Sequence, residues 1–532
     1  MRKNLLLAIF SGLLLWIAWP PTAYTSFLLF VGLVPMLMAI ENIIQSPVKQ
    51  KGRLIFATSF IGFFAWNSLS IYWVYNALKE VGNLIAIPIA LIPYSLGPLL
   101  MASACWLYYR FRLATSRGIG LIGLVCFWMT YEYLHQSWDL AFPWMTLGNG
   151  FAVSHKWIQW YEYTGVYGGT IWIWAINILL FLLYTSLREA QPKAYRQKLV
   201  TAFVLVLVLP LGFSLYRYYS FQEQPDPSNV VVVQPNVNPN AKFGTPNQLE
   251  IDTLTHLSDS LAQPNTEYFI WPETALAEDI DEDQMRTNSA YAQVKHFLGR
   301  YKNGNVITGV SSSKTYEDQR TITASTMPGG LFKDYYNAAV NIENSENIQF
   351  YHKSKLVPGA EMIPFSSLSF LRPAFEHLGG AAGSFGSQKD VGVFYSQSGI
   401  GADPVICYES IWGDWVARSV RKGAQFIAII TNDGWWENTA GKDQHLAYAK
   451  LRAIENRRWI CRSANTGISA FINERGDIVQ HSAWWVRTAL KQDINLNSDF
   501  TFYTLHGDYL PKIAMWLSLL GAIWIVYKRV RR

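Results

Sequence analysis

Residues 199–233 read LVTAFVLVLVLPLGFSLYRYYSFQEQPDPSNVVVV, and they join two different kinds of sequence. The first half is an apolar run close to the length of about 20 residues that a membrane-spanning helix needs. After Pro225-Asp226-Pro227, the β-branched run Val230–Val233 is typical of a strand in a buried sheet. The stretch therefore predicts a chain in which a membrane part is followed by a folded α/β part.

The composition fits a chain that is only partly surrounded by water. Of its 532 residues, 50% are hydrophobic and 15% are charged, whereas an ordinary globular chain has about 25% charged residues. This profile excludes a disordered, collagenous or disulfide-rich protein. The four cysteines, at positions 105, 126, 407 and 461, show no metal-binding spacing. We therefore expect neither a metal nor an organic cofactor.

Apolar runs in both terminal regions predict eight membrane-spanning helices. Their approximate limits are 4–19, 26–44, 55–75, 85–108, 119–135, 166–187, 199–216 and 511–527. Sixteen lysines and arginines lie in the tails and loops on one side of these helices, but only Lys79 and Lys156 lie in loops on the other side. Because basic loops remain in the cytoplasm, we expect both termini to be cytoplasmic.

This topology divides the chain into three parts. Residues 1–216 would contain the first seven helices, residues 217–510 a domain outside the cytoplasm, and residues 511–532 the last helix with a basic tail. In a bacterium, this arrangement is that of a multi-pass protein of the inner membrane whose middle part faces the periplasm.

The middle part alternates short apolar or β-branched runs with helix-like stretches. The expected strands are 230–233, 268–271, 306–310, 338–342, 404–407, 426–430 and 468–472, and the expected helices include 248–261, 291–301 and 444–458. Such alternation is typical of one α/β domain whose sheet is covered by helices.

Three places in this domain, at strand ends or in loops, carry groups suited to acid–base or nucleophilic chemistry. One apolar strand runs into a proline and then Glu273, a carboxylate that apolar surroundings can make a general base. A basic stretch offers Lys353, a cation able to face a developing oxyanion. A third strand ends in Cys407, whose thiolate can be favoured by backbone N–H groups and a lysine. Taken singly, such residues are more often turn, surface or core residues.

Together, in the order Glu273, Lys353 and Cys407 within one α/β domain, they resemble the nitrilase, or carbon-nitrogen hydrolase, superfamily. The resemblance implies a four-layer α-β-β-α sandwich. It also implies that Glu273 is the general base, Lys353 the cation that stabilises the oxyanion, and Cys407 the nucleophile.

The same resemblance implies supporting positions. Glu361 matches a further glutamate of the family, and Tyr408 and Glu409 match the residues that follow the nucleophile. The turn before Glu361 reads Pro358-Gly359-Ala360 where the family usually has Pro-Phe-Gly, so we expect this turn to differ in detail.

With membrane helices on both sides of the domain, the whole chain is similar to bacterial membrane enzymes that N-acylate lipoproteins. The similarity implies transfer of a fatty acyl chain from a membrane phospholipid, through a Cys407 thioester, to the α-amine of the N-terminal diacylglyceryl-cysteine of an apolipoprotein. Phospholipid and diacylated apolipoprotein are thus the expected partners, nucleic acid is not one, and we expect a monomer. Phe243, Trp144 and Trp435 are expected to contact substrate, although Trp435 could simply fill the domain edge.

Residues 363–389, between Lys353 and Cys407, mix apolar side chains with glycines. We predict that this stretch is a mobile lid that contacts lipid. The plainer interpretation is an ordinary surface loop.

Three other interpretations stay open. A membrane-tethered nitrilase-type amidase would use the same triad with water as acceptor, although tethering needs only one helix. A transporter is disfavoured because the spans contain few ionisable residues and no internal repeat is evident. A Cys–His hydrolase would pair Cys407 with His445 or His506, which the spacing alone does not exclude.

Overall fold

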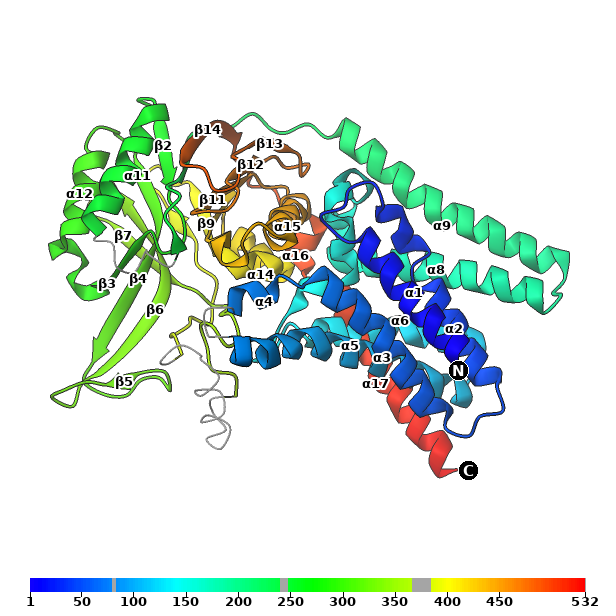
Figure 1. Ribbon diagram of the computed structural model, residues 1–532. Helices are drawn as coiled ribbons and strands as arrows, with labels where there is room; N and C mark the ends of the chain where they lie inside the picture. Colours follow the sequence, from blue (N-terminus) through cyan, green and yellow to red (C-terminus); the bar gives the residue numbers. More distant parts are fainter. Residues whose placement is uncertain (79–82, 240–246, 366–383, 532) are drawn as a thin grey trace. The chain divides into compact units, whose positions relative to one another are not determined.

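The computed structural model describes residues 1–78, 83–239, 247–365 and 384–531. It separates into two compact units, shown by colour along the chain in Figure 1. The helical unit comprises Met1–Phe221 and Asp508–Arg532, and the α/β unit comprises Gln222–Gly507. Each unit is described below by itself.

The helical unit is built from long helices joined by short helical turns. The long helices are α1 (Arg2–Ala18), α2 (Val34–Gln45), α3 (Lys51–Ser70), α5 (Asn83–Ala114), α6 (Arg117–Leu134), α8 (Val166–Arg188), α9 (Lys193–Ser220) and α17 (Tyr509–Val530). The short ones are η1 (Ser26–Phe30), α4 (Val74–Leu78), η3 (Pro143–Met145), η4 (Leu147–Trp157) and α7 (Tyr161–Thr164). Helical segments thus occupy part of each of the eight ranges predicted to span the membrane.

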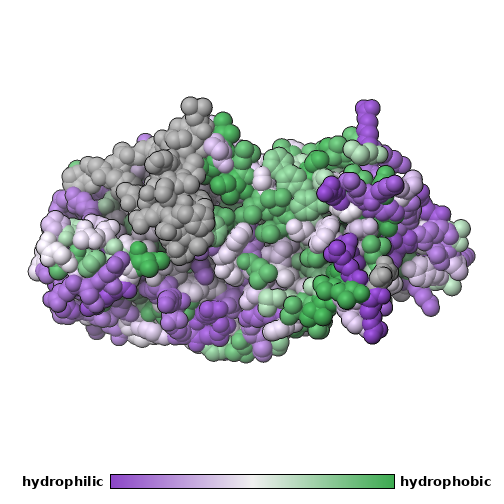
Figure 2. Space-filling view, turned by 90° about the horizontal axis from the view of Figure 1, so that it is seen from below, coloured by the Kyte–Doolittle hydropathy of each residue, from purple (hydrophilic) through white to green (hydrophobic). Residues whose placement is uncertain are grey.

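Several of these helices have the length and outer surface of membrane helices. Within the described residues, five stretches are long and apolar enough to cross a membrane: Ser26–Gln45, Ala86–Ala114, Val166–Arg188, Lys193–Ser220 and Tyr509–Val530. Large apolar side chains on α9 and α17, such as Leu209 and Leu520, are more than half exposed. Figure 2 shows apolar residues gathered over the helical unit. This surface fits a hydrocarbon solvent, whereas the total of eight spans stays a prediction.

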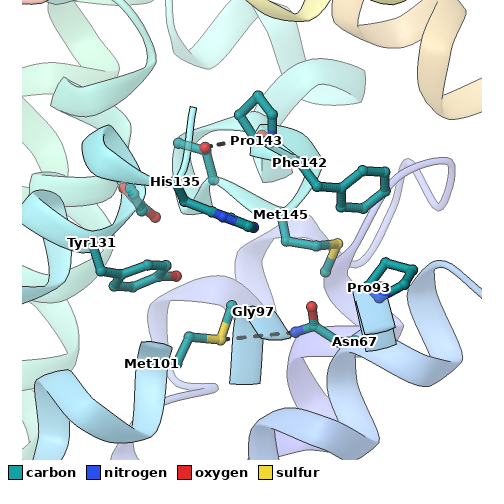
Figure 3. Close-up of a pocket in the computed structure, with 11 residues that line it drawn as sticks. Asn67, Pro93, Gly97, Met101, Tyr131, His135, Phe142, Pro143 and Met145 are labelled. Carbon is teal, nitrogen blue, oxygen red and sulfur yellow. Dashed lines mark hydrogen bonds between the residues drawn. The ribbon is translucent and has the colours of Figure 1, made fainter. Parts of the chain in front are cut away.

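The segment that follows α6 folds back into the helical unit and does not form an open loop. The buried carboxylate of Glu132 accepts hydrogen bonds from Trp128 Nε1 (2.9 Å), Leu147 N (2.8 Å) and Thr170 Oγ1 (2.9 Å). It therefore ties the start of η4 to α6 and α8. Figure 3 shows the small cavity beside this segment, into which Tyr131 of α6 and His135, the residue after α6, point.

The strands of the α/β unit form two sheets. In the first sheet the order is β14 (Thr488–Asn495), β1 (Pro227–Gln234), β2 (Thr266–Ile270), β4 (Asn305–Tyr316), β6 (Phe332–Glu343) and β5 (Ser325–Thr326), with β3 (Leu276–Asp281) beside β4 and β7 (Ile348–His352) beside β6. In the second sheet it is β13 (Ile478–His481), β12 (Ala470–Ile472), β11 (Ile460–Ala464), β10 (Phe426–Thr431), β9 (Gly401–Ile406) and β8 (Phe394–Tyr395). The central pairs β1–β2, β2–β4, β9–β10 and β10–β11 are parallel.

Alternating side chains divide the α/β unit into four layers. On β1, Val230 and Val232 face the second sheet in a shared core, whereas Val231 and Val233 pack with α11 (Asn247–Leu261) and α12 (Ser289–Leu298). The outer face of the second sheet packs in the same way against α14 (Gly413–Arg421) and α15 (Ala440–Asn456). The predicted α-β-β-α sandwich is therefore confirmed.

Candidate active site

Glu273 lies on the turn that follows β2, and the neighbouring strand β4 presses closely against this turn. A Cβ atom on Gly309 would lie 2.6 Å from Glu273 Cα and 2.3 Å from Thr274 N, so only glycine fits at this position of β4. The Gly309 N–H also donates to the Pro272 carbonyl oxygen at 3.1 Å. These contacts fix the backbone that carries the buried Glu273 carboxylate.

Lys353 directly follows β7 and is buried between two carboxylates. Its Nζ donates to Glu273 Oε1 at 2.9 Å and to Glu361 Oε1 at 2.8 Å. Burial acts to lower the pKa of Lys353, but the two carboxylates outweigh it and raise the pKa well above its usual value. The lysine is therefore a charged ammonium in the folded protein.

Asn337, on β6, completes this cluster, although it was not among the residues predicted from the sequence. Its Nδ2 donates to Glu273 Oε1 at 2.8 Å and to Glu361 Oε1 at 2.7 Å. Each of the two carboxylate oxygens thus accepts from both Lys353 and Asn337, and the four groups form a closed ring of hydrogen bonds. A single sequence gives no signal for such an asparagine beyond its position directly before the predicted strand 338–342.

Cys407 stands where β9 ends and the 3₁₀ helix η6 (Cys407–Ile411) begins. Its backbone φ of 49° lies in the left-handed region, which is costly for a residue with a Cβ atom. Burial and the nearby Glu273 carboxylate raise the pKa of the Cys407 thiol, while Lys353 acts to lower it. The Cys407 thiol and the Glu273–Lys353 pair come from different sheets, since Cys407 follows a strand of the second sheet and the pair follows strands of the first.

Glu409 joins the two strand ends that carry Lys353 and Cys407. Its Oε1 accepts from Tyr351 Oη and from Ser354 N, both at 2.7 Å, and its Oε2 accepts from Ile406 N at 2.9 Å. Burial raises the pKa of Glu409 even though these donors oppose the shift. These hydrogen bonds connect the end of β7 to the end of β9.

The two histidines considered as partners for Cys407 lie in different surroundings. His445, on α15, is fully buried, and its Nε2 lies 3.2 Å from the Cys407 carbonyl oxygen. His506, on α16 (Phe502–His506), is exposed and its Nδ1 faces the Phe502 carbonyl oxygen at 2.9 Å. His445 thus lies against the backbone carbonyl of Cys407.

The three predicted substrate contacts lie in different parts of the chain. Trp144 lies in the helical unit, fully buried between Trp73 and Phe142 at ring distances of 4.8 and 5.9 Å. Trp435 is half-buried in η7 (Asp433–Trp436) of the α/β unit. Phe243 lies outside the described residues, as does most of the predicted lid at 363–389. These contacts and the lid stay predictions.

The buried Tyr408 ring packs edge-on against Trp412 at 4.8 Å, so its side chain belongs to the packing of η6. Among the residues that the structure describes, no group of three or more His, Cys, Asp or Glu side chains is arranged to hold a metal ion. The chemistry that the cluster offers is that of a thiol beside a carboxylate and a buried ammonium.

Two family models match the chain in adjacent regions. The model described as apolipoprotein N-acyltransferase N-terminal domain matches residues 11–179, and the model described as carbon-nitrogen hydrolase matches residues 250–498. The second match covers most of the α/β unit, whose four-layer sandwich is that of a carbon-nitrogen hydrolase domain.

Relatives extend this similarity over the whole chain. The apolipoprotein N-acyltransferase of Chlorobaculum tepidum is 28% identical over 99% of this chain and 98% of its own, and that of Geobacter metallireducens is 26% identical over 100% and 96%. Over nearly its whole length, this chain is therefore similar to apolipoprotein N-acyltransferases. Among solved structures it is similar to Saccharomyces cerevisiae Nit3 of the nitrilase superfamily, with a TM-score of 0.36, 13% identity, and coverage of 55% of this chain and 97% of that chain.

Proposed function

We propose that this protein transfers a fatty acyl chain from a membrane phospholipid to the α-amine of the N-terminal diacylglyceryl-cysteine of apolipoproteins. The observation that carries the proposal is the buried Lys353 ammonium, which Glu273 and Glu361 hold at a strand end that Glu409 connects to the strand end carrying Cys407. Relatives that match the chain over nearly its whole length are apolipoprotein N-acyltransferases, which supports this acceptor over water.

In the first half-reaction, Cys407 attacks the ester carbonyl carbon of the phospholipid. Because burial raises the pKa of the thiol, its proton must pass to Glu273 as the S–C bond forms. The oxygen that becomes negative is stabilised by the Lys353 ammonium and by the backbone N–H of Tyr408. The C–O bond to glycerol then breaks, Glu273 returns the proton to the leaving oxygen, and a lysophospholipid departs from a Cys407 thioester.

In the second half-reaction, the free α-amine of the lipoprotein attacks the thioester carbonyl carbon. The N–C bond forms and the C–S bond breaks, while Glu273 takes a proton from the amine and returns it to the thiolate. Lys353 faces the same oxygen in both tetrahedral intermediates, so one cation serves both steps. The products are an amide-linked third acyl chain and the restored thiol.

The proposed reaction requires that the active site lie at the bilayer surface, because both substrates keep their acyl chains in hydrocarbon. We place the protein in the bacterial inner membrane with eight spans, both termini in the cytoplasm and the α/β unit in the periplasm. The apolar outer faces of α9 and α17 and the distribution of basic residues support this placement.

Intact-protein mass spectrometry of the full-length enzyme after incubation with phospholipid tests the function. Wild type should gain one acyl mass that hydroxylamine removes and that a diacylated lipopeptide discharges. Cys407→Ala should gain none. The Cys461→Ala variant is a matched control, because Cys461 is a fully buried core residue of β11 and should leave the adduct intact.

Two results would contradict the proposal. Acylation of the lipopeptide without any adduct on the enzyme would remove the thioester mechanism. An adduct that only water discharges would instead indicate a membrane-tethered amidase or hydrolase.

A further inference from the structure

The left-handed backbone of Cys407 needs contacts that hold it in place. Its carbonyl oxygen provides them: Ser410 Oγ donates to it at 2.8 Å, and His445 Nε2 lies 3.2 Å from it. Ser410 Oγ and His445 Nε2 are themselves 2.9 Å apart. Both side chains are fully buried. The Cys407 carbonyl is therefore enclosed by two side chains that lie outside the proposed Glu273–Lys353–Cys407 triad.

His445 is held in turn by a buried acid. Its Nδ1 lies 2.9 Å from Asp433 Oδ1, which also accepts from Thr431 Oγ1 at 2.9 Å. Burial opposes the charge of Asp433, but the ion pair with Arg462 and the contact with His445 hold the pKa of that carboxyl below its usual range. Arg462 Nη2, which can only donate, lies 3.2 Å from the same Nδ1, so the buried Asp433–Arg462 pair fixes the ring and leaves Nε2 as the N–H that faces the Cys407 carbonyl.

This order of serine, histidine and aspartate superficially matches a hydrolase triad. However, the Ser410 hydroxyl is fully buried and donates to the Cys407 carbonyl, so it does not face a substrate. The contacts of Asp433, His445 and Ser410 lead instead to the backbone carbonyl of Cys407. Its role must therefore be sought in what that carbonyl controls.

A trans peptide unit is planar, and its C=O and N–H bonds point in opposite directions. The unit that contains the Cys407 carbonyl also contains the Tyr408 N–H. Whatever holds the carbonyl on one edge therefore aims the N–H on the other edge. Oxyanion stabilisation depends on N–H donors that are aimed before the reaction begins.

We infer that Ser410 and His445 are positioning residues that aim the Tyr408 N–H at the oxyanion by holding the Cys407 carbonyl, with Asp433 and Arg462 fixing His445. The inference rests on the proposed acyl transfer through Cys407. It assigns His445 a role in both half-reactions without any transfer of a proton by its ring.

The test compares two reactions of the same thiol in the full-length enzyme. Acylation by phospholipid passes through an oxyanion, whereas alkylation by iodoacetamide forms the S–C bond with loss of iodide and needs no oxyanion site. His445→Ala should lower the acylation rate about tenfold to a hundredfold, somewhat less than the loss of a complete oxyanion donor. The loss should lie in kcat with KM unchanged, and the alkylation rate should stay the same.

His445→Gln places an amide N–H near the position of Nε2 and should restore most of the acylation rate. His506→Gln is the matched control, because His506 is exposed on α16 and its Nδ1 lies 2.9 Å from the Phe502 carbonyl oxygen, and both rates should stay at the wild-type value.

Three results would overturn the inference. An unchanged acylation rate in His445→Ala would show that the contact is idle. Equal losses of acylation and alkylation would indicate a base for the thiol or a collapsed site. Absence of an adduct on wild type would reject the acyl-transfer function itself, and that result is read from the wild-type protein before any variant is compared.

Discussion

At the scale of single residues, the site is a problem of charge balance. Two carboxylates, Glu273 and Glu361, share one ammonium, Lys353, in a buried place. Asn337 makes this possible because its neutral amide gives each carboxylate oxygen a second donor without adding charge. The ring therefore holds Glu273 at a fixed distance from Lys353. The ammonium stays charged, as its proposed role at the oxyanion requires.

Replacing Asn337 by aspartate should disrupt this balance. Asn337→Asp removes both donated hydrogen bonds and brings a third carboxylate against Glu273 and Glu361, so we expect acylation of Cys407 to fall by at least tenfold, about 1.4 kcal/mol. The control is Asn341→Ala on the same strand, because Asn341 is buried and neither polar atom of its side chain has a hydrogen-bond partner in the described part of the structure. That control should keep the wild-type rate of adduct formation. Equal rates for Asn337→Asp and wild type would show that the ring is dispensable.

The thiol of Cys407 should show its raised pKa directly. Burial, the largest effect, raises this pKa, so below it the thiolate fraction falls tenfold for each pH unit. In Glu273→Gln, which lacks the proposed base, iodoacetamide alkylation of Cys407 should still be rising at pH 9, where an ordinary exposed thiol approaches its plateau. A plateau near pH 8 would show that Lys353 outweighs burial.

At the scale of elements, the sequence predicted strands where apolar runs were compact and missed them where they were mixed. The runs 268–271 and 426–430 correspond to β2 and β10, because buried parallel strands are apolar on both faces. β7 and β14 were missed because polar residues alternate along them, as in Gln349 and Lys491. β4 continues to Tyr316, beyond the predicted 306–310, where long antiparallel pairing with β6 supports polar residues.

The same limit explains which parts of the site were predictable. Glu273, Lys353 and Cys407 stand at strand ends and carry recognisable chemistry, so one sequence and a family resemblance were enough to propose them. Asn337 acts through Glu273 and Glu361, which are distant in the chain, and Ser410 acts together with the distant His445 on the nearby Cys407 carbonyl. Such contacts depend on how β6 and η6 pack, which periodicity and composition do not specify.

Gly309 connects an element to the site. A methyl group there would meet the backbone of Glu273 and Thr274 at less than 3 Å, so Gly309→Ala should shift the turn that carries Glu273. We expect a loss of stability of about 1–3 kcal/mol, typical of overpacking, together with slower acylation. Gly212→Ala on α9, where no atom lies within 4 Å of the added carbon, is the control. Thermal unfolding and adduct formation measure the two effects, and an unchanged Gly309→Ala protein would mean that the turn is not set by β4.

At the scale of the whole molecule, the predicted topology can be tested without disturbing the helices. Arg112 and Arg117 contribute to the basic side, but both also pair with the buried Glu41 of α2, so substituting them would confuse orientation with packing. Epitope tags after residue 532 and within 46–50 should be reached only after the cytoplasmic face is opened. A tag in the exposed stretch 317–320 should be reached from outside. Exposure of all three tags on one face would refute the proposed orientation.

The two halves of the site come from different sheets, since Glu273 and Lys353 follow strands of the first sheet and Cys407 follows a strand of the second. How the two sheets pack therefore sets the separation between the Cys407 thiol and the Glu273 carboxylate, and the core between the sheets includes Ile270 of one sheet and Ile430 of the other. These interior side chains thus act as spacers for the proposed proton transfer. Removing or adding a single methyl group on these side chains should change the spacing of the two sheets, and with it the rate of acyl transfer, although no charged or reactive group is altered.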